Sequence, residues 1–395
     1  MRLRTLDRLD DLAGLRAFVR VDLNVPLADG AVSDDSRIRA SLPTIRELRE
    51  RGASVVLASH LGRPKGRPDP QLRLAPVAAR LAELLDEPVR SLEEVTPSEV
   101  PDEPLVLLQN LRFDPGEEGN DPAFAGRLAE LADAYVDDAF GAVHRAHASV
   151  AALPELMLAS GRPAVAGRLV EREVTVLDRL LHTPDRPFVA ILGGAKVSDK
   201  LGVIDALLDR VDALLVGGAM AFTLLAAEGG EVGRSLVEPD RFGDVRASLA
   251  KARERGVVVE LPADVVAAAE PSVEVPSRTV LAREIPRDLM GLDIGPRTVE
   301  GFVRIIAEAK TVLWNGPMGV FELEPFSAGT RGVAMAVAGA PAFSVVGGGD
   351  SLAAIRRAGL DDAFDHLSTG GGASLEFLEG RPLPGLTVLE EGSSA

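Results

Sequence analysis

Residues 188–200 read FVAILGGAKVSDK, and this stretch contains the pattern that decides the fold. The apolar run at 188–192 predicts a short buried strand, a glycine pair follows it, and a helical pattern begins at about residue 199. The same order of apolar run, polar or glycine-rich turn and helix recurs along the chain. Short apolar strands that alternate with helices indicate parallel sheets covered by helices on both faces.

Other apolar runs predict strands at 17–24, 54–59, 105–109, 213–217, 311–314 and 342–346. Helical patterns occur at 36–51, 74–85, 122–132, 199–209, 238–255, 296–309, 326–339 and 351–358. Because 395 residues are too many for one hydrophobic core, we expect two α/β domains. The segment GRLVEREVTVLDRLLHTPDRP, residues 167–187, predicts one helix that joins them and ends before Pro184.

Composition narrows the function classes. The chain has no cysteine, which excludes disulfides and cysteine-based metal sites and fits a reducing cytoplasm. The net charge of −17 argues against nucleic acid as a partner, because its phosphates require a basic face. The first residues, MRLRTLDRLDD, lack the apolar core of a signal peptide, and the longest uncharged stretch, 213–227, is too short to cross a bilayer.

Polar and basic residues follow the strands of the first half. In open parallel sheets ligands bind beyond the carboxyl ends of the strands, so these residues are candidates for a site. Asp22 and Asn24 lie two residues apart, and we expect them on one face of the first strand. The other candidates are Arg37, His60, Arg63, Lys65, Arg67, Arg112, His144, Arg145 and His147. Arginine forks and histidines suit a carboxylate and a phosphate, whereas the alternative is a set of surface ion pairs.

Glycine-rich runs follow the strands of the second half. They are GGAKVSDK (193–200), GGAMAF (217–222), WNGPMGVFE (314–322), GGGDS (347–351) and STGGGAS (368–374). Glycine lets backbone amides approach phosphate oxygens. Asp350 could meet a magnesium ion together with waters and phosphate oxygens, or it could cap a helix. The chain has no GxxxxGK[ST], no GxGxxG and no protein-kinase HRD or DFG set.

One half thus predicts a basic pocket and the other a glycine-lined polyphosphate pocket. This pairing suits phosphoryl transfer, which needs alignment, neutralisation of charge and exclusion of water. The chain resembles the phosphoglycerate kinase family in a series of motifs that run in the family's order from residue 20 to residue 380. These motifs are RVDLNVP, SHLGRP, NLRF, DDAFGAVHRAHAS, ILGGAKVSDK, GGAMAFT, LDIGP, WNGPMGVFE, SVVGGGDS and STGGGASLEFLEG.

The resemblance implies two Rossmann-like domains with mainly parallel sheets, joined by a hinge helix. Residues 1–166 would bind phosphoglycerate, with 378–395 packing back on them; 167–182 would be the hinge helix, and 183–377 would bind the nucleotide. The implied function is a glycolytic phosphotransferase with a carboxyl group as acceptor. It would move a phosphoryl group reversibly from 1,3-bisphosphoglycerate to ADP, giving 3-phosphoglycerate and ATP. The resemblance also implies magnesium, hinge closure, a monomer and a cytoplasmic location.

The resemblance assigns roles residue by residue. Phosphoglycerate would be held by Asp22, Asn24, Arg37, His60, Arg63, Arg112 and Arg145. The nucleotide would be held by Lys196, Lys200, Gly217, Gly218, Asn315, Glu322, Gly347, Gly348, Gly349, Asp350 and Ser351. Within this set, Gly217 and Gly218 would meet the adenine, Glu322 the ribose and Asp350 the magnesium ion. Catalytic roles would belong to Arg37, Lys196, Gly371 and Gly372, the last two preceding a helix whose amides face the moving phosphate.

Some positions depart from the family's usual pattern. They are Gln109 for glutamate, Asp137 for asparagine, Arg168 for an apolar residue, Ala219 for glycine and Arg297 for lysine. None is among the ligands named above, although Arg168 bears on the hinge surface. Two rival interpretations are a non-catalytic nucleotide-binding protein and a dehydrogenase. Retention of Arg37, Lys196 and Asp350 argues against the first, and the missing dinucleotide fingerprint argues against the second.

Overall fold

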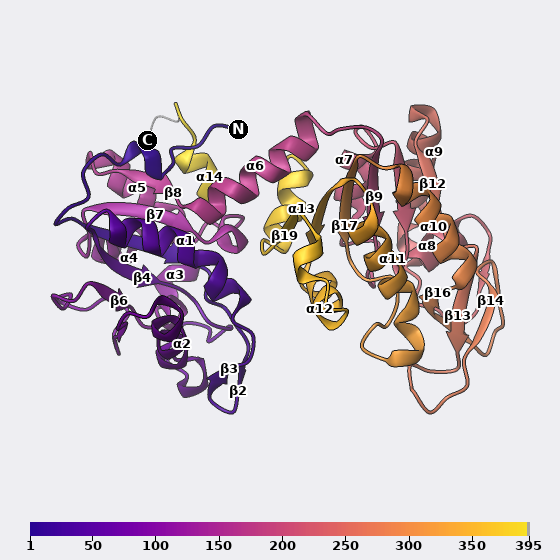
Figure 1. Ribbon diagram of the computed structural model, residues 1–395, viewed down its shortest axis with the longest axis horizontal. Helices are drawn as coiled ribbons and strands as arrows, with labels where there is room; N and C mark the ends of the chain where they lie inside the picture. The colour runs from indigo at the N-terminus through magenta and orange to yellow at the C-terminus, as the bar shows by residue number, and fades with distance from the viewer. Residues whose placement is uncertain (393–395) are drawn as a thin grey trace. The chain divides into compact units, whose positions relative to one another are not determined.

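The computed structural model describes residues 1–392, which form two compact units (Figure 1). The first unit contains Met1–Thr175 and the C-terminal segment that begins at Pro382, and the second contains Val176–Arg381. Helix α6 (Arg168–His182) carries the chain from one unit to the other. None of the helices within residues 1–392 combines the length and the apolar character that a membrane-spanning segment needs.

A parallel six-stranded sheet forms the centre of the first unit, in the order β5–β6–β4–β1–β7–β8. Its strands are β1 (Arg16–Val21), β4 (Ser54–Ala58), β5 (Arg90–Ser91), β6 (Leu105–Leu107), β7 (Ala134–Asp138) and β8 (Ala164–Ala166). A small antiparallel pair, β2 (Leu27–Ala28) and β3 (Ala31–Val32), follows β1. The helices of this unit are α1 (Ser36–Glu50), α2 (Ala75–Leu85), α3 (Pro115–Glu118), α4 (Pro122–Ala129), α5 (Ala152–Ala159) and α14 (Pro384–Leu389).

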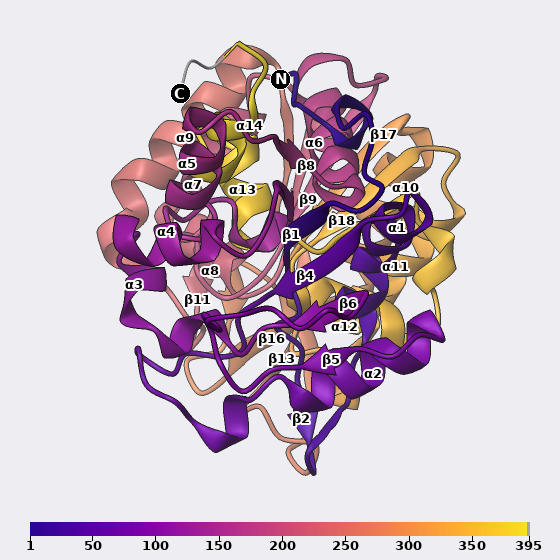
Figure 2. The same ribbon diagram turned by 90° about the vertical axis from the view of Figure 1, so that its left-hand side faces the viewer.

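Helices cover both faces of this sheet, and the pleat explains why both faces are apolar. Figure 2 shows α1 and α2 on one side of the sheet and α4 and α5 on the other. Val19 of β1 and Val136 of β7 pack in one buried cluster with Ile38 of α1. Their neighbours Phe18 and Tyr135 point to the opposite face, where their rings stack with centroids 6.0 Å apart.

The second unit is built around another parallel six-stranded sheet, in the order β12–β10–β9–β17–β18–β19. Its strands are β9 (Phe188–Leu192), β10 (Ala213–Val216), β12 (Val258–Glu260), β17 (Thr311–Asn315), β18 (Phe343–Gly347) and β19 (His366–Ser368). An antiparallel sheet joins β13 (Asp264–Ala268), β14 (Arg278–Leu281) and β16 (Met290–Ile294), and β11 (Glu231–Val232) pairs with β15 (Glu284–Ile285). The helices are α7 (Leu201–Leu207), α8 (Met220–Ala227), α9 (Phe242–Arg255), α10 (Pro296–Glu308), α11 (Ala328–Gly339), α12 (Gly349–Arg357) and α13 (Gly372–Leu378).

Alternate residues of the second sheet face different sets of helices. Ile191 of β9 packs in one buried cluster with Phe302 of α10 and Val333 of α11. On the other face, Leu214 of β10 and Leu249 of α9 border one small apolar gap. All strands of the six-stranded sheet run parallel, so the loops at their carboxyl ends meet at one edge.

The predicted fold class is confirmed, because the structure has two parallel six-stranded sheets flanked by helices. The sequence analysis missed β7, although this strand lies inside the first sheet. Its sequence, AYVDD, ends in two fully buried aspartates, so an apolar criterion passes over it. One detail of the analysis is wrong: β1 ends at Val21, so Asp22 and Asn24 lie in the loop after the strand and do not share a strand face.

The carboxyl group of Asp137 is fully buried at the end of β7. Its Oδ1 accepts a hydrogen bond from the Ala139 N–H at 2.9 Å, and its Oδ2 lies 3.2 Å from the Tyr135 hydroxyl oxygen. The same hydroxyl lies 2.8 Å from the Ser149 carbonyl oxygen, and its single proton cannot serve both acceptors. Burial raises the pKa of Asp137 to about 6, because a low dielectric disfavours the charged form.

We therefore expect Asp137→Asn to stabilise the chain at pH 8. The new amide can donate to the Tyr135 hydroxyl oxygen, and no charge is buried. Since the pKa of the folded-state carboxyl group is raised, its stabilising contribution is present below about pH 4 and is lost as the pH rises through about 6. The free energy of unfolding should rise by about 1–3 kcal/mol at pH 8 and by much less near pH 4. Urea unfolding at both pH values measures this, and an equal gain at both would contradict the burial argument.

Candidate active site

Three loops of the first unit are tied together at the carboxyl edge of its sheet. The Gly62 N–H, in the loop after β4, donates to Asn24 Oδ1 at 2.9 Å, and Asn24 belongs to the loop after β1. The Gly62 carbonyl oxygen accepts a hydrogen bond from Nη1 of Arg112, in the loop after β6, at 2.8 Å. These bonds join the loops that carry Asn24, His60 and Arg112.

A second contact positions Arg37 at the start of α1. Its Nη1 donates to Oδ2 of the buried Asp22 at 2.6 Å. Arg63 and Arg145, the other two predicted ligands, are exposed in the loops after β4 and β7. The charge of Arg145 lowers the pKa of His147, after burial and two other arginines, so it adjoins the same basic cluster.

The buried arginine Arg20 supports this cluster, and the sequence analysis did not single it out. Its Nη2 lies 3.0 Å from Nδ1 of His60, its Nε donates to Ser149 Oγ at 2.8 Å, and its Nη1 donates to the Val21 carbonyl oxygen at 2.6 Å. Arginine only donates, so Nδ1 of His60 is the acceptor and the ring proton lies on Nε2. The available signal was a charged residue inside the otherwise apolar strand RAFVRV.

Both histidines of the cluster are held neutral. Burial, and then the charge of Arg20, lower the pKa of His60 well below its ordinary value. Burial, and then the charge of Arg112, lower the pKa of His147 to about 4. At neutral pH the positive charge therefore resides on the arginines, while His60 offers a neutral N–H donor. Such a cluster can bind a small anion that has both a carboxylate and a phosphate.

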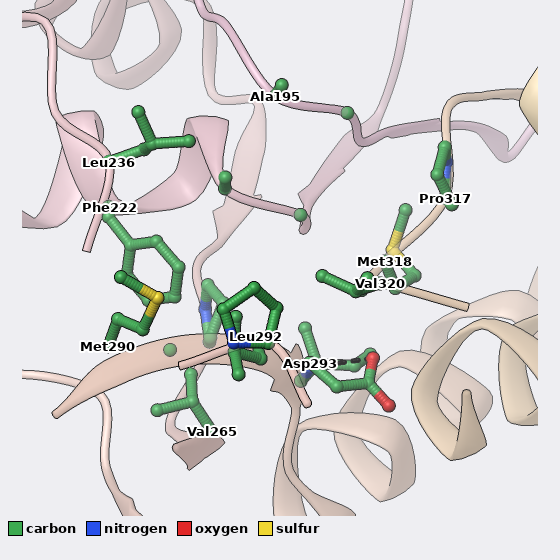
Figure 3. Close-up of a pocket in the computed structure, with 18 of the residues that line it drawn as sticks. Ala195, Phe222, Leu236, Val265, Met290, Leu292, Asp293, Pro317, Met318 and Val320 are labelled. Atoms are coloured by element: carbon green, nitrogen blue, oxygen red, sulfur yellow. Dashed lines mark hydrogen bonds between the residues drawn. The ribbon is translucent and has the colours of Figure 1, made fainter. Parts of the chain in front are cut away.

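The second unit contains an open, mostly apolar cavity of about 500 Å³ at the edge of its sheet. Figure 3 shows Phe222, Leu236 and Met290 on one side of it and Met318 and Val320 on the other. The sequence analysis missed this lining, because these side chains look like ordinary core residues. A cavity of this size and character suits a flat ring system such as a nucleotide base.

Glycines around the cavity allow loops to pack backbone against backbone. A Cβ on Gly218 would lie 2.5 Å from the Gly194 nitrogen, and one on Gly316 would clash with the Gly193 carbonyl oxygen. Hydrogen bonds of 3.0 Å join the loops 193–194 and 217–218 to the loop 316–318. These glycines are therefore required by the contacts between loops, which form one wall of the cavity.

The glycines after β18 and β19 have different surroundings. A Cβ on Gly347 would lie 3.3 Å from Asn315 Nδ2, and one on Gly348 would lie 3.2 Å from it. A Cβ on Gly349 or Gly371 would meet nothing within 4 Å. The open space that a phosphate group would need thus lies beside Gly349 and Gly371.

The two lysines after β9 differ in environment. Lys196 is exposed, whereas Lys200 is buried and its Nζ donates to the carbonyl oxygen of Asn315 at 3.2 Å and to its side-chain oxygen. Burial lowers the pKa of Lys200 to about 8, and the charges of Asp199 and Asp350 act in the opposite direction. A nucleotide phosphate nearby would stabilise the charged form of Lys200.

The start of α12 holds Asp350 and Ser351. Asp350 is exposed in the first turn, and the N-cap is Gly348, so Asp350 is not the cap of this helix. Ser351 is buried, and its Oγ accepts a hydrogen bond from the Gly316 N–H at 2.7 Å. No group of three acidic or histidine side chains suited to a metal occurs within residues 1–392. Asp350 alone fits a magnesium ion that takes its other ligands from water and phosphate.

The departures from the family pattern lie outside these polar contacts, although Ala219 lines the cavity. Gln109 is buried, and its Oε1 accepts hydrogen bonds from two backbone N–H groups at 3.1 and 2.9 Å. Arg168 forms ion pairs of 2.6–2.7 Å with Asp7, Glu47 and Glu171, all within the first unit.

A basic anion site on one α/β unit and an apolar cavity beside a buried lysine on another define a nucleotide-dependent phosphotransferase. A family model for phosphoglycerate kinase matches residues 6–381. The phosphoglycerate kinase of Rubrobacter xylanophilus is 57% identical over 387 residues, which cover 96% of this chain and 97% of the relative. That of Thermus thermophilus is 55% identical over 401 residues, covering 98% and 100%. The chain belongs to the phosphoglycerate kinase family.

Solved structures agree with this assignment. The phosphoglycerate kinase of Coxiella burnetii has a TM-score of 0.87 and 41% identity, covering 98% of each chain. That of Pyrococcus horikoshii has a TM-score of 0.85 and 33% identity, with the same coverage. The reaction is accordingly the glycolytic transfer of a phosphoryl group between 1,3-bisphosphoglycerate and ADP, with a carboxyl group as acceptor in the reverse direction.

We expect His60 to remain the neutral Nε2–H tautomer as the pH falls through the range in which an ordinary histidine becomes charged, because Arg20 donates to its Nδ1. Arg20→Met should raise the pKa of His60 toward its ordinary value, since one of the causes that lower it is removed. NMR of ¹⁵N in the imidazole ring reports both tautomer and protonation, and His60→Gln identifies the signal. Arg20→Lys, which keeps a charged donor, is the matched control. An imidazolium signal from His60 near pH 6 in the unaltered chain would show that this account is wrong.

Proposed function

We propose that the first unit binds phosphoglycerate, that the second binds magnesium–nucleotide, and that transfer proceeds without a covalent enzyme intermediate. The observation that carries this proposal is the separation of two kinds of site. One unit has arginines around a neutral histidine donor, and the other has an apolar cavity beside a buried lysine. Phosphoryl transfer depends mainly on positioning and on neutralising charge, which such groups supply.

At the phosphoglycerate end, Arg37 is the residue that would touch the moving phosphoryl group. Asp22 accepts from its Nη1, and Arg37 still has donors on Nη2 and Nε for an anion. The carboxylate and the distal phosphate of the ligand would be bound by the remaining residues of the set, which are Asn24, His60, Arg63, Arg112 and Arg145. Their forked and neutral donors match the geometry of such oxygens.

At the nucleotide end, the adenine would occupy the apolar cavity beside Gly217 and Gly218, and Glu322 would accept hydrogen bonds from the ribose. The phosphates would pass Asn315 and the glycines from Gly347 to Gly349, toward Lys200. The exposed Lys196 and the amides at Gly371 and Gly372 would stabilise the transferring group. Support comes from the cavity lining, which includes Glu322, Gly218 and Asp350.

We also propose that magnesium binds with the nucleotide and that Asp350 holds it through one carboxylate. The ion, when bound, neutralises charge on the nucleotide phosphates. Asp350 is exposed, and its charge acts on Lys200, so both groups would face the same phosphates.

The two ligand sets lie in different units, so we propose that the units close during the reaction. Donor and acceptor oxygens must approach to about 3–3.5 Å of the attacked centre, and closure also excludes water. The segments that we expect to bend are α6 and the chain after Gly372. Closing would bring Arg37 and Lys196 to the same phosphoryl group. The monomeric state and the cytoplasmic location remain predictions from the family resemblance.

Replacing Lys196 with alanine should lower kcat by about 10²–10³ and change KM little, because its ammonium would act on charge that develops during transfer. Lys310→Ala is the matched control. Lys310 directly precedes β17, so it lies at the amino end of that strand, whereas the proposed site lies at the carboxyl ends. Steady-state kinetics with both substrates measures the effect. An unchanged kcat with a raised KM would assign Lys196 to ground-state binding instead.

Replacing Asp350 with alanine should weaken ADP binding in the presence of magnesium and affect it little without the metal. Binding of 3-phosphoglycerate should stay the same, because its proposed ligands belong to the first unit. Isothermal titration with each ligand, with and without magnesium, separates these effects. Equal losses of ADP affinity in both conditions would exclude Asp350 as the metal ligand.

A further inference from the structure

The last residue of α12, Arg357, holds the loop that carries Glu322. Its Nη1 donates to the Phe321 carbonyl oxygen at 3.2 Å and to the Glu322 carbonyl oxygen at 2.8 Å. Within residues 1–392, no backbone N–H donates to either of these carbonyl groups. Arg357 is therefore the donor that both carbonyl groups use.

Helix α12 lines the cavity of the second unit at its first turn and is linked to it through Glu322 at its last residue. Asp350, in its first turn, lines the cavity directly. Arg357, at its other end, fixes the backbone of Glu322, which also lines the cavity. Helix α12 thus links the turn that carries Asp350 to the backbone of Glu322.

The direction of Glu322 depends on its backbone, because its side chain is exposed and packing does not fix it. The nearest backbone bonds of this loop join the Val320 N–H to the Leu292 carbonyl oxygen at 2.8 Å and the Leu323 N–H to the Val320 carbonyl oxygen at 3.0 Å. Neither bond involves Glu322 itself. Losing the Arg357 contact would leave the Phe321–Glu322 peptide group without a hydrogen bond to any of residues 1–392, and only the Leu323 N–H would still hold the Glu322–Leu323 peptide group.

We propose that Arg357 is a positioning residue for ribose recognition: it holds the Glu322 backbone so that the carboxylate meets a ribose hydroxyl group. This inference rests on the proposed ribose contact of Glu322. Arg357 itself is not among the residues that line the cavity. A carboxylate that is held in place discriminates between a nucleotide with the hydroxyl group and one without it. A mobile carboxylate discriminates poorly.

The test compares ADP with 2′-deoxyADP and 3′-deoxyADP as phosphoryl acceptors. Arg357→Ala should lower kcat/KM for ADP about three- to tenfold, the range expected for one lost hydrogen bond. For the deoxy analogue that lacks the hydroxyl bound by Glu322, kcat/KM should change less than about twofold, since that hydrogen bond is already missing. Arg357→Lys should retain part of the preference for ADP.

Arg356→Ala is the matched control, because Arg356 occupies the same helical turn and its Nε faces Asp361 at 3.6 Å. Arg356→Ala should leave kcat/KM unchanged for ADP and for both deoxy analogues. Thermal unfolding of each variant checks that the second unit stays folded.

Glu322→Ala, measured in parallel, separates the inference from the function on which it rests. If this variant keeps the full preference for ADP over both deoxy analogues, the proposed ribose contact is wrong. If Glu322→Ala loses the preference and Arg357→Ala keeps it, the role of Arg357 is overturned. An equal loss for all three nucleotides in Arg357→Ala would also overturn it.

Discussion

Parallel strands place their carboxyl ends at one edge of a sheet, and the residues proposed as ligands in this chain depend on that constraint. In the first unit the loops after β1, β4 and β6 reach this edge and are joined there through Asn24, Gly62 and Arg112. In the second unit the loops after β9, β10 and β17 meet in the same way. The two sites are thus built on one architectural rule.

The two units satisfy that rule with different chemistry. In the first unit, hydrogen bonds from polar side chains join the loops. The buried Arg20 donates to Nδ1 of His60 and so fixes the tautomer of that histidine. The second uses direct backbone contact, for which a side chain at Gly218 or Gly316 leaves no room. Fixed donors suit the anion proposed for the first unit. The apolar cavity and the open space beside Gly349 and Gly371 suit the base and the phosphates proposed for the second.

The alternation of strand and helix, and the fold class that follows from it, could be predicted because apolar runs and helical patterns are local. β7 could not, since Asp137 and Asp138 are buried by tertiary contacts that no local pattern reports. Spacing placed Lys196 and Lys200 near the same loop, but only the fold shows that one is exposed and the other buried. The apolar lining of the cavity could not be predicted, because Phe222 and Met290 are residue types that are equally common in hydrophobic cores.

The central claim is that the two substrates start on different units and must be brought together. X-ray scattering in solution tests it most directly, with 3-phosphoglycerate alone, with magnesium–ADP alone and with both. The account predicts the smallest radius of gyration with both ligands, smaller changes with either alone, and a forward scattering that corresponds to one chain. A radius of gyration that no combination of ligands changes, or full compaction with a single ligand, would contradict it.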